Sequence, residues 1–111
     1  YRHPTGKIIL GCPAGYLDKG ESPIEAAQRE LLEETGYEAE SFTLIGSAYP
    51  YAGFSGQKNY FVRAFNASCK SSPKLEQSEI IRPRILTPRE FEQAVAQNSE
   101  IDANLGTALY F

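Results

Sequence analysis

A capped, acid-rich segment in the first third of the chain constrains its fold more than any other feature. Ser22 suits the N-cap of a helix and Pro23 its first position, while Glu25 completes a capping box. Gly36 suits the residue that ends the helix. The pattern predicts a helix over Pro23–Thr35, around which the rest of the domain must pack.

On a helical wheel this segment separates an apolar stripe from a group of acids. Ile24, Ala27 and Leu31 form the stripe that we expect to be buried. Glu30 and Glu34 lie next to each other at the margin of the stripe, about 6 Å apart along the helix axis. The wheel therefore places two stacked carboxylates beside the core.

The acids lie where an isolated helix disfavours them. Glu33 and Glu34 fall in the last turn, where the helix dipole favours cations and each anion costs roughly 0.3–1 kcal/mol. Glu30 and Glu34 also repel each other at i,i+4 spacing. A solvated acidic face is the ordinary meaning of such a run. A divalent cation would nevertheless neutralise it, and oxygen ligands select hard ions, so the segment predicts a site for Mg²⁺ or Mn²⁺.

The remaining elements alternate between short strands and helices. The strands expected from apolar runs and alternation are Lys7–Cys12, Phe42–Tyr49, Lys58–Asn66 and Glu79–Leu86. Apolar residues on both faces of Lys58–Asn66 predict a central strand. Cap residues from Thr87 to Glu90 predict a second helix that ends near Gln97, and a third begins near Asp102. Interleaved strands and helices predict a layered α/β (α+β) domain with a mixed sheet.

Composition excludes several classes of protein. The 111 residues suit a single domain, residues 1–111, and 41% hydrophobic with 23% charged residues is typical of a globular chain. A net charge of −3 argues against nucleic acid as the main partner. The chain contains no apolar run of the ~18 residues that a membrane span needs. Two cysteines without C-x-x-C spacing suit a reducing compartment, so we expect a soluble cytoplasmic protein.

The acids also stand in a motif, residues 15–37, whose spacing resembles the Nudix box. Its matching residues are Gly15, Glu21, Arg29, Glu30, Leu31, Glu33, Glu34, Gly36 and Tyr37. Seven of these places are fixed, and seven fixed places filled by residue types of ~5–7% abundance would coincide by chance with a probability on the order of 10⁻⁸ per start. Outside the box, Tyr1-Arg2, Pro13-Ala14-Gly15, the Pro50–Lys58 loop and Ile101-Asp102-Ala103 resemble the ADP-ribose/sugar-nucleotide pyrophosphatase branch of the family.

The resemblance implies a Nudix fold, in which a mixed sheet lies between helices (α/β/α), and we expect this chain to lack the amino-terminal strands of that fold. It also implies that the protein forms a homodimer if a segment that pairs subunits precedes Tyr1. It implies that Glu30, Glu34, the Ala14 carbonyl and a downstream glutamate bind the metal. Glu79 is our choice for that glutamate and Glu76 the alternative.

Other roles follow from the same match. The catalytic residues implied are Glu33, Glu34 and Glu79, and either Glu33 or Glu79 could accept the proton of the attacking water. Gly15, Glu21, Arg29 and Gly36 would support the box, and the substrate-binding residues implied are Arg2, Tyr16, Gly53 and Gln57. Three aromatic residues in or beside the glycine-rich loop Pro50–Lys58 could stack on a base or merely pack: Tyr49, Tyr51 and Phe54.

The function implied is Mg²⁺- or Mn²⁺-dependent cleavage of the pyrophosphate bond of ADP-ribose or a related nucleoside-diphosphate sugar. The products would be a nucleoside monophosphate and a sugar phosphate. Dinucleoside polyphosphates and oxidised nucleotides are alternative substrates, because the box is common to enzymes for all of them. A nucleotide sensor without catalysis is the alternative of another class. Such sensors are expected to lose box glutamates or the arginine, which this chain retains.

Overall fold

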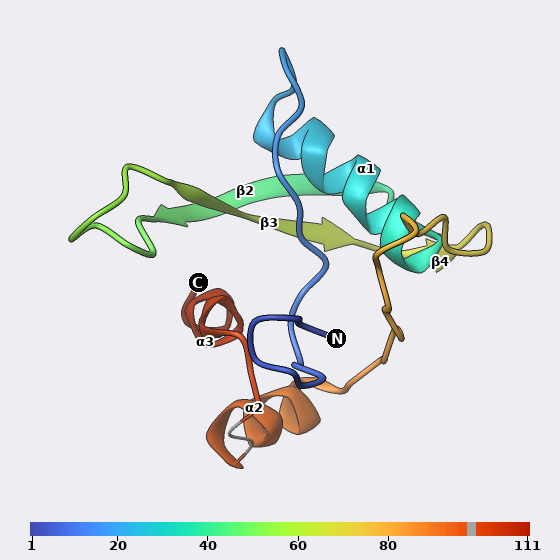
Figure 1. Ribbon diagram of the computed structural model, residues 1–111. Helices are drawn as coiled ribbons and strands as arrows, with labels where there is room; N and C mark the ends of the chain where they lie inside the picture. Colours follow the sequence, from blue (N-terminus) through green and yellow to red (C-terminus); the bar gives the residue numbers. More distant parts are fainter. Residues whose placement is uncertain (98–99) are drawn as a thin grey trace. The chain divides into compact units, whose positions relative to one another are not determined.

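The computed structural model describes residues 1–97 and 100–111. Its elements, in chain order, are α1 (Pro23–Thr35), β1 (Tyr37–Glu38), β2 (Ser41–Ala48), β3 (Asn59–Phe65), β4 (Ser68–Cys69), α2 (Pro88–Gln97) and α3 (Ala103–Tyr110) (Figure 1). They belong to two compact units. The box unit comprises Pro13–Lys74 with Phe111, and the terminal unit comprises Tyr1–Cys12 with Leu75–Tyr110.

Helix α1 of the box unit has the predicted bounds because its caps act as expected. Ser22 Oγ accepts a hydrogen bond from the Glu25 amide at 3.1 Å. At the other end Gly36 adopts φ 77°, and its amide donates to the Leu32 carbonyl at 2.8 Å. The predicted apolar stripe is only half-buried, whereas Ala26 is 5% exposed. The caps therefore fixed the ends of the helix better than the wheel identified its buried face.

A hairpin of β2 and β3 gives α1 its packing partner (Figure 1). The two strands pair antiparallel from Ser41 opposite Phe65 to Ala48 opposite Asn59, with an irregularity between Leu44 and Gly46. The prediction that Lys58–Asn66 forms a central strand is wrong, because β3 pairs with β2 alone among the described strands. Apolar residues on both faces of a strand report what covers those faces and not how many strands lie beside it.

A later segment covers the carboxyl end of α1. Strands β1 and β4 pair antiparallel, and the chain after β4 then donates the Lys70 and Ser71 amides to the Gly36 carbonyl at 2.8 and 3.1 Å. The Lys74 amide donates to the Glu33 carbonyl at 2.7 Å. Carbonyls that a helix leaves without partners in its last turn are thus satisfied by residues more than thirty positions downstream.

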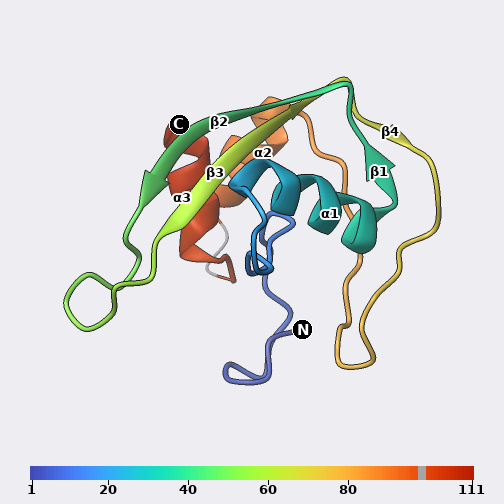
Figure 2. The same ribbon diagram turned by 90° about the horizontal axis from the view of Figure 1, so that it is seen from above.

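The terminal unit contains α2 and α3, which contact each other (Figure 2). The predicted capping box of α2 is confirmed: the Thr87 amide donates to Glu90 Oε2 at 2.8 Å, and the Glu90 amide donates to Thr87 Oγ1 at 3.2 Å. Helix α3 begins after Asp102, whose Oδ1 accepts from the Asn104 amide at 2.8 Å. Leu105 is the buried residue of α3, at 3% exposure.

Two predicted strands are wrong. Lys7–Cys12 makes only isolated bridges, an antiparallel one between Lys7 and Arg2 and a parallel one between Leu10 and Ile101. Glu79–Leu86 has no strand pairing, since Pro83 lacks an amide donor in its middle. No helix in the described part of the chain has the length and apolar character that crossing a bilayer requires.

Candidate active site

Arg29 organises the loop before α1. Its Nε donates to Glu21 Oε2 at 2.8 Å, and its Nη2 donates to Glu21 Oε1 at 3.0 Å, so the pair is bidentate. Nη2 also donates to the Tyr16 carbonyl at 2.9 Å. The hydrogen bonds from Arg29, before any other cause, lower the pKa of Glu21 to about 2. Glu21 therefore stays ionised at neutral pH and holds the loop against the helix.

The same guanidinium reaches the acids of the helix. Its Nη1 donates to Glu30 Oε1 at 2.7 Å and to Glu33 Oε2 at 3.3 Å. Its Nε lies 3.3 Å from Asp18 Oδ2, a fourth carboxylate. Hydrogen bonds with Glu21 and then Glu30 raise the pKa of Arg29, so its charge is permanent. Arg29 thus joins Glu21 of the loop to Glu30 and Glu33 of the helix by direct ion pairs.

The segment before the loop accommodates the two stacked carboxylates. The Ala14 amide donates to Glu34 Oε2 at 3.0 Å. The carboxylate of Glu30 lies over Gly15, where an added Cβ would overlap Glu30 Oε1 and lie 2.8 Å from Oε2. Gly15 is thus a cradle for Glu30, which gives its predicted supporting role a steric cause. Binding of a metal by the Ala14 carbonyl stays a prediction.

The cluster suits a hard cation in chemistry and in charge. Four carboxylates contact one guanidinium, which leaves a net formal charge of −3: Asp18, Glu21, Glu30 and Glu33. Glu34, one helical turn after Glu30, adds a further negative charge on the same helix. The side chain of Glu30 is 15% exposed and that of Glu33 is 45% exposed, so the group is open to solvent on one side. Within residues 1–97 and 100–111, no three acids already converge on a common point. The donors therefore fit a dication, and their final arrangement around it requires side-chain movement.

Three other predicted residues come from both units, two from the terminal unit and one from the box unit. Arg2 and Glu79 belong to the terminal unit, where the Arg2 amide donates to the Lys7 carbonyl at 2.8 Å and the Glu79 amide donates to the Glu76 carbonyl at 2.9 Å. Tyr16 belongs to the box unit and is 83% exposed. The roles proposed for these residues stay predictions.

The glycine-rich loop carries an exposed aromatic group. Tyr51 and Phe54 stack with ring centroids 5.5 Å apart. Lys58 Nζ lies 5.6 Å from the ring centroid of Tyr49 and 5.5 Å from that of Tyr60. Gln57 Nε2 donates to Asn59 Oδ1 at 3.1 Å, and no atom lies within 4 Å of a Cβ built on Gly53. The loop is therefore held by its own side chains, and base stacking on it stays a prediction.

Sequence reasoning missed Asp18 as a partner of Arg29. The Asp18 amide donates to Glu21 Oε1 at 2.8 Å, and the Glu21 amide donates to the Asp18 carbonyl at 3.0 Å. These two bonds fix the turn that carries the Asp18 carboxylate to Arg29. The turn signal at Asp18-Lys19-Gly20 was the only trace of this in the sequence.

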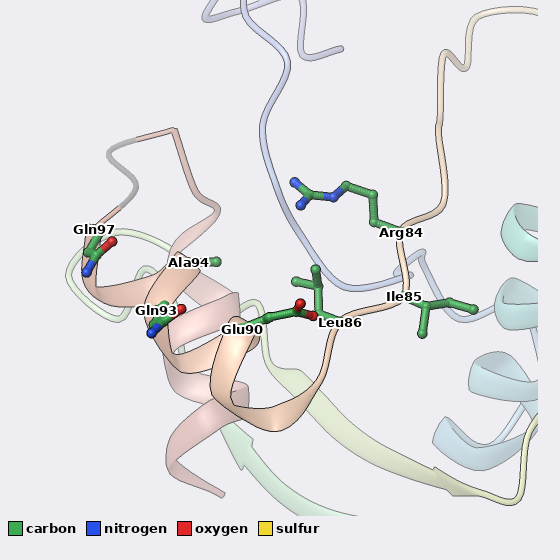
Figure 3. A pocket seen from close by; sticks show the side chains of 7 residues that line it. All are labelled: Arg84, Ile85, Leu86, Glu90, Gln93, Ala94 and Gln97. Carbon is green, nitrogen blue, oxygen red and sulfur yellow. The ribbon is translucent and has the colours of Figure 1, made fainter.

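A cavity of about 560 Å³ lies elsewhere, in the terminal unit between α2 and the chain before it (Figure 3). Its lining residues are Arg84, Ile85, Leu86, Glu90, Gln93, Ala94 and Gln97. None of them is a predicted site residue, and the Glu90 carboxylate already caps α2. The candidate active site is therefore the acid cluster around α1 and not this cavity.

Comparisons with known proteins identify the family of the chain. The model of the NUDIX domain matches residues 1–105. The chain is 31% identical over 112 aligned residues to "ADP-ribose pyrophosphatase" of Bacillus subtilis (strain 168), and 34% identical over the same length to "Methanol dehydrogenase activator" of Bacillus methanolicus. Both alignments cover 100% of this chain and 60% of the relative.

A solved structure extends the similarity to the fold. The crystal structure of an ADP compounds hydrolase superposes with a TM-score of 0.84 and 25% identity over 99% of this chain and 59% of that one. The chain thus spans about three fifths of the length of these relatives. The predicted Nudix fold is confirmed. From the box residues, their geometry and these matches, we conclude that the chain belongs to the Nudix family.

Proposed function

We propose that this protein hydrolyses the pyrophosphate bond of ADP-ribose or a related nucleoside-diphosphate sugar with the help of Mg²⁺ or Mn²⁺. The observation that carries the proposal is the group of four carboxylates around Arg29, with Glu34 one turn further along the helix, whose excess negative charge favours bound cations. A substrate diphosphate is itself an anion, so it needs bound cations to approach such a surface. The names of two relatives support the substrate class: ADP-ribose pyrophosphatase and ADP compounds hydrolase.

In this proposal Glu30 and Glu34 hold the cation, together with the Ala14 carbonyl and Glu79. A bound dication lowers the pKa of a water molecule and offsets charge that develops on phosphoryl oxygens. Glu34 is kept in place by the Ala14 amide, and Glu30 by Arg29 and by the space over Gly15.

The other roles concern the proton and the substrate. Glu33 is more exposed than Glu30 and could accept the proton of the attacking water, as could Glu79. Arg2 would bind substrate phosphate, and Tyr16, Gly53 and Gln57 would contact the rest of the molecule. We further propose a cytoplasmic homodimer as the working form.

The test is a substitution that removes one metal ligand and keeps its shape. In Glu34→Gln the amide can no longer supply a full negative charge, so AMP release from ADP-ribose should fall by roughly 10²–10³-fold. Product chromatography with and without Mg²⁺ measures this directly. Glu38→Gln, at an exposed position of β1, is the matched control and should retain wild-type turnover.

Two outcomes would contradict the proposal. Equal AMP release by wild type with and without dication would exclude the metal mechanism. Tight ADP-ribose binding without AMP release over hours would instead indicate a nucleotide sensor. A wider panel with dinucleoside polyphosphates and oxidised nucleotides would identify an enzyme with another substrate.

A further inference from the structure

Arg29 faces more carboxylates than it can neutralise, and they divide into two groups. Glu21 and Asp18 lie at its Nε edge, at 2.8 and 3.3 Å. Glu30 and Glu33 lie at Nη1, at 2.7 and 3.3 Å. The first group belongs to the loop and the second to the helix face on which the dication is proposed to bind.

Glu30 is therefore shared between two cations. Its Oε1 accepts a hydrogen bond from Arg29 Nη1, and the same carboxylate is a proposed metal ligand. A dication that binds Glu30 must weaken this ion pair, because both cations draw on the charge of one carboxylate. The strength of the Arg29–Glu30 pair thus enters the free energy of metal binding.

We propose that Asp18 is a positioning residue that raises the affinity of the box for its dication by drawing Arg29 toward the loop. The proposal rests on the metal site proposed above. Two backbone hydrogen bonds between Asp18 and Glu21 fix the turn from which the Asp18 carboxylate reaches Nε. Each unit of charge supplied at the Nε edge leaves less of the guanidinium charge for Glu30.

Asp18 suits this role better than Glu21. Glu21 is a box residue with a bidentate hold on Arg29, and its side chain is 13% exposed, so its loss would also disturb the loop. The Asp18 side chain is 71% exposed and occupies none of the motif places, so it can be changed with little effect on folding. We expect an exposed ion pair such as Arg29–Asp18 to change the affinity for the dication moderately and not to be essential for binding.

The experiment measures Mn²⁺ binding to the metal-free protein by calorimetry or by electron paramagnetic resonance, without substrate. Asp18→Asn should raise the Kd for Mn²⁺ about two- to fivefold, the range that an exposed ion pair supplies. Asp18→Glu keeps the charge and should restore a Kd near that of wild type. Glu38→Gln removes one carboxylate from an exposed position outside the group around Arg29 and is the charge-matched control.

A double-mutant cycle separates positioning from simple attraction of the ion. In the Arg29→Lys background, which lacks the Nε–H and Nη geometry, Asp18→Asn should change the Kd less than it does in wild type. An equal change in both backgrounds, or no rescue by Asp18→Glu, would overturn the proposal. If Arg29→Lys does not fold, the Kd of Asp18→Glu for Mn²⁺ is the deciding measurement.

The result is distinguishable from failure of the proposed function. Wild-type protein that does not bind Mn²⁺ would contradict both the metal site and the role of Asp18. Wild-type protein that binds Mn²⁺ with a Kd unchanged by Asp18→Asn would contradict the role of Asp18 alone.

Discussion

Gly15 illustrates at the scale of one residue what a motif position requires. Its missing side chain leaves room for the Glu30 carboxylate, which lies across the space that a Cβ would fill. The position is not one of positive φ, so the requirement comes from the neighbour and not from the backbone. A sequence motif records such a requirement without revealing which atom causes it.

Gly15→Ala should therefore affect the site more than the fold. The new methyl group must push aside the flexible end of Glu30, which should lower Mn²⁺ affinity and AMP release about tenfold or more. The melting temperature should change little, because no backbone needs to move.

Gly56→Ala is the control for Gly15→Ala, since nothing lies within 4 Å of a Cβ built at Gly56 and its φ is not positive. It should match wild type in both measurements. Equal Mn²⁺ affinity in Gly15→Ala and Gly56→Ala would contradict the inference that the space over Gly15 positions the Glu30 carboxylate.

At the scale of the element, α1 was predictable because its caps are local. Ser22 and Gly36 bond to residues three or four positions away, so the signals that fix both ends are contained in the segment itself. The prediction of a strand over Glu79–Leu86 failed because local signals cannot decide whether a strand forms. A strand exists only where a partner lies beside it, and the position of a partner is not a local property.

Gly36 and Gly20 form a matched pair that separates the cost of backbone strain from the cost of steric overlap. Both have positive φ, of 77° and 81°. An added Cβ at Gly20 meets nothing within 4 Å, whereas at Gly36 it would overlap the Ser71 carbonyl oxygen.

Gly20→Ala should cost about 1–2 kcal/mol of unfolding free energy from backbone strain alone. Gly36→Ala should cost clearly more, because the Ser71 backbone must also move. Urea unfolding followed by circular dichroism measures both, and equal losses would show that the segment after β4 adapts freely.

At the scale of the whole molecule, Phe111 is the clearest case of a role that sequence does not reveal. Its ring lies 5.4 Å from that of Phe61, which is 9% exposed, and it would lie 2.6 Å from a Cβ on Gly46. Arg63 Nη2 donates to the Phe111 carbonyl at 3.4 Å. A residue far along the chain thus completes the core of the β2–β3 hairpin.

Phe111→Ala should lower the free energy of unfolding by about 1–3 kcal/mol, the value of a partly buried aromatic ring. Tyr110→Ala removes a neighbouring ring that is 88% exposed and should cost much less. Chemical denaturation of the two variants compares them. Equal losses would show that the ring of Phe111 adds nothing to the hairpin core.

The sequence by itself determined α1, its acids and the spacing of the box, because caps, helical periodicity and motif spacing act over short stretches of chain. It also predicted that Glu21 and Arg29 support the box. Only the tertiary structure decided that Asp18 joins Arg29, that Glu30 lies over Gly15 and that Ser71 meets Gly36. Each of these contacts depends on where the folded backbone brings two segments together, and that placement follows from packing of the whole chain.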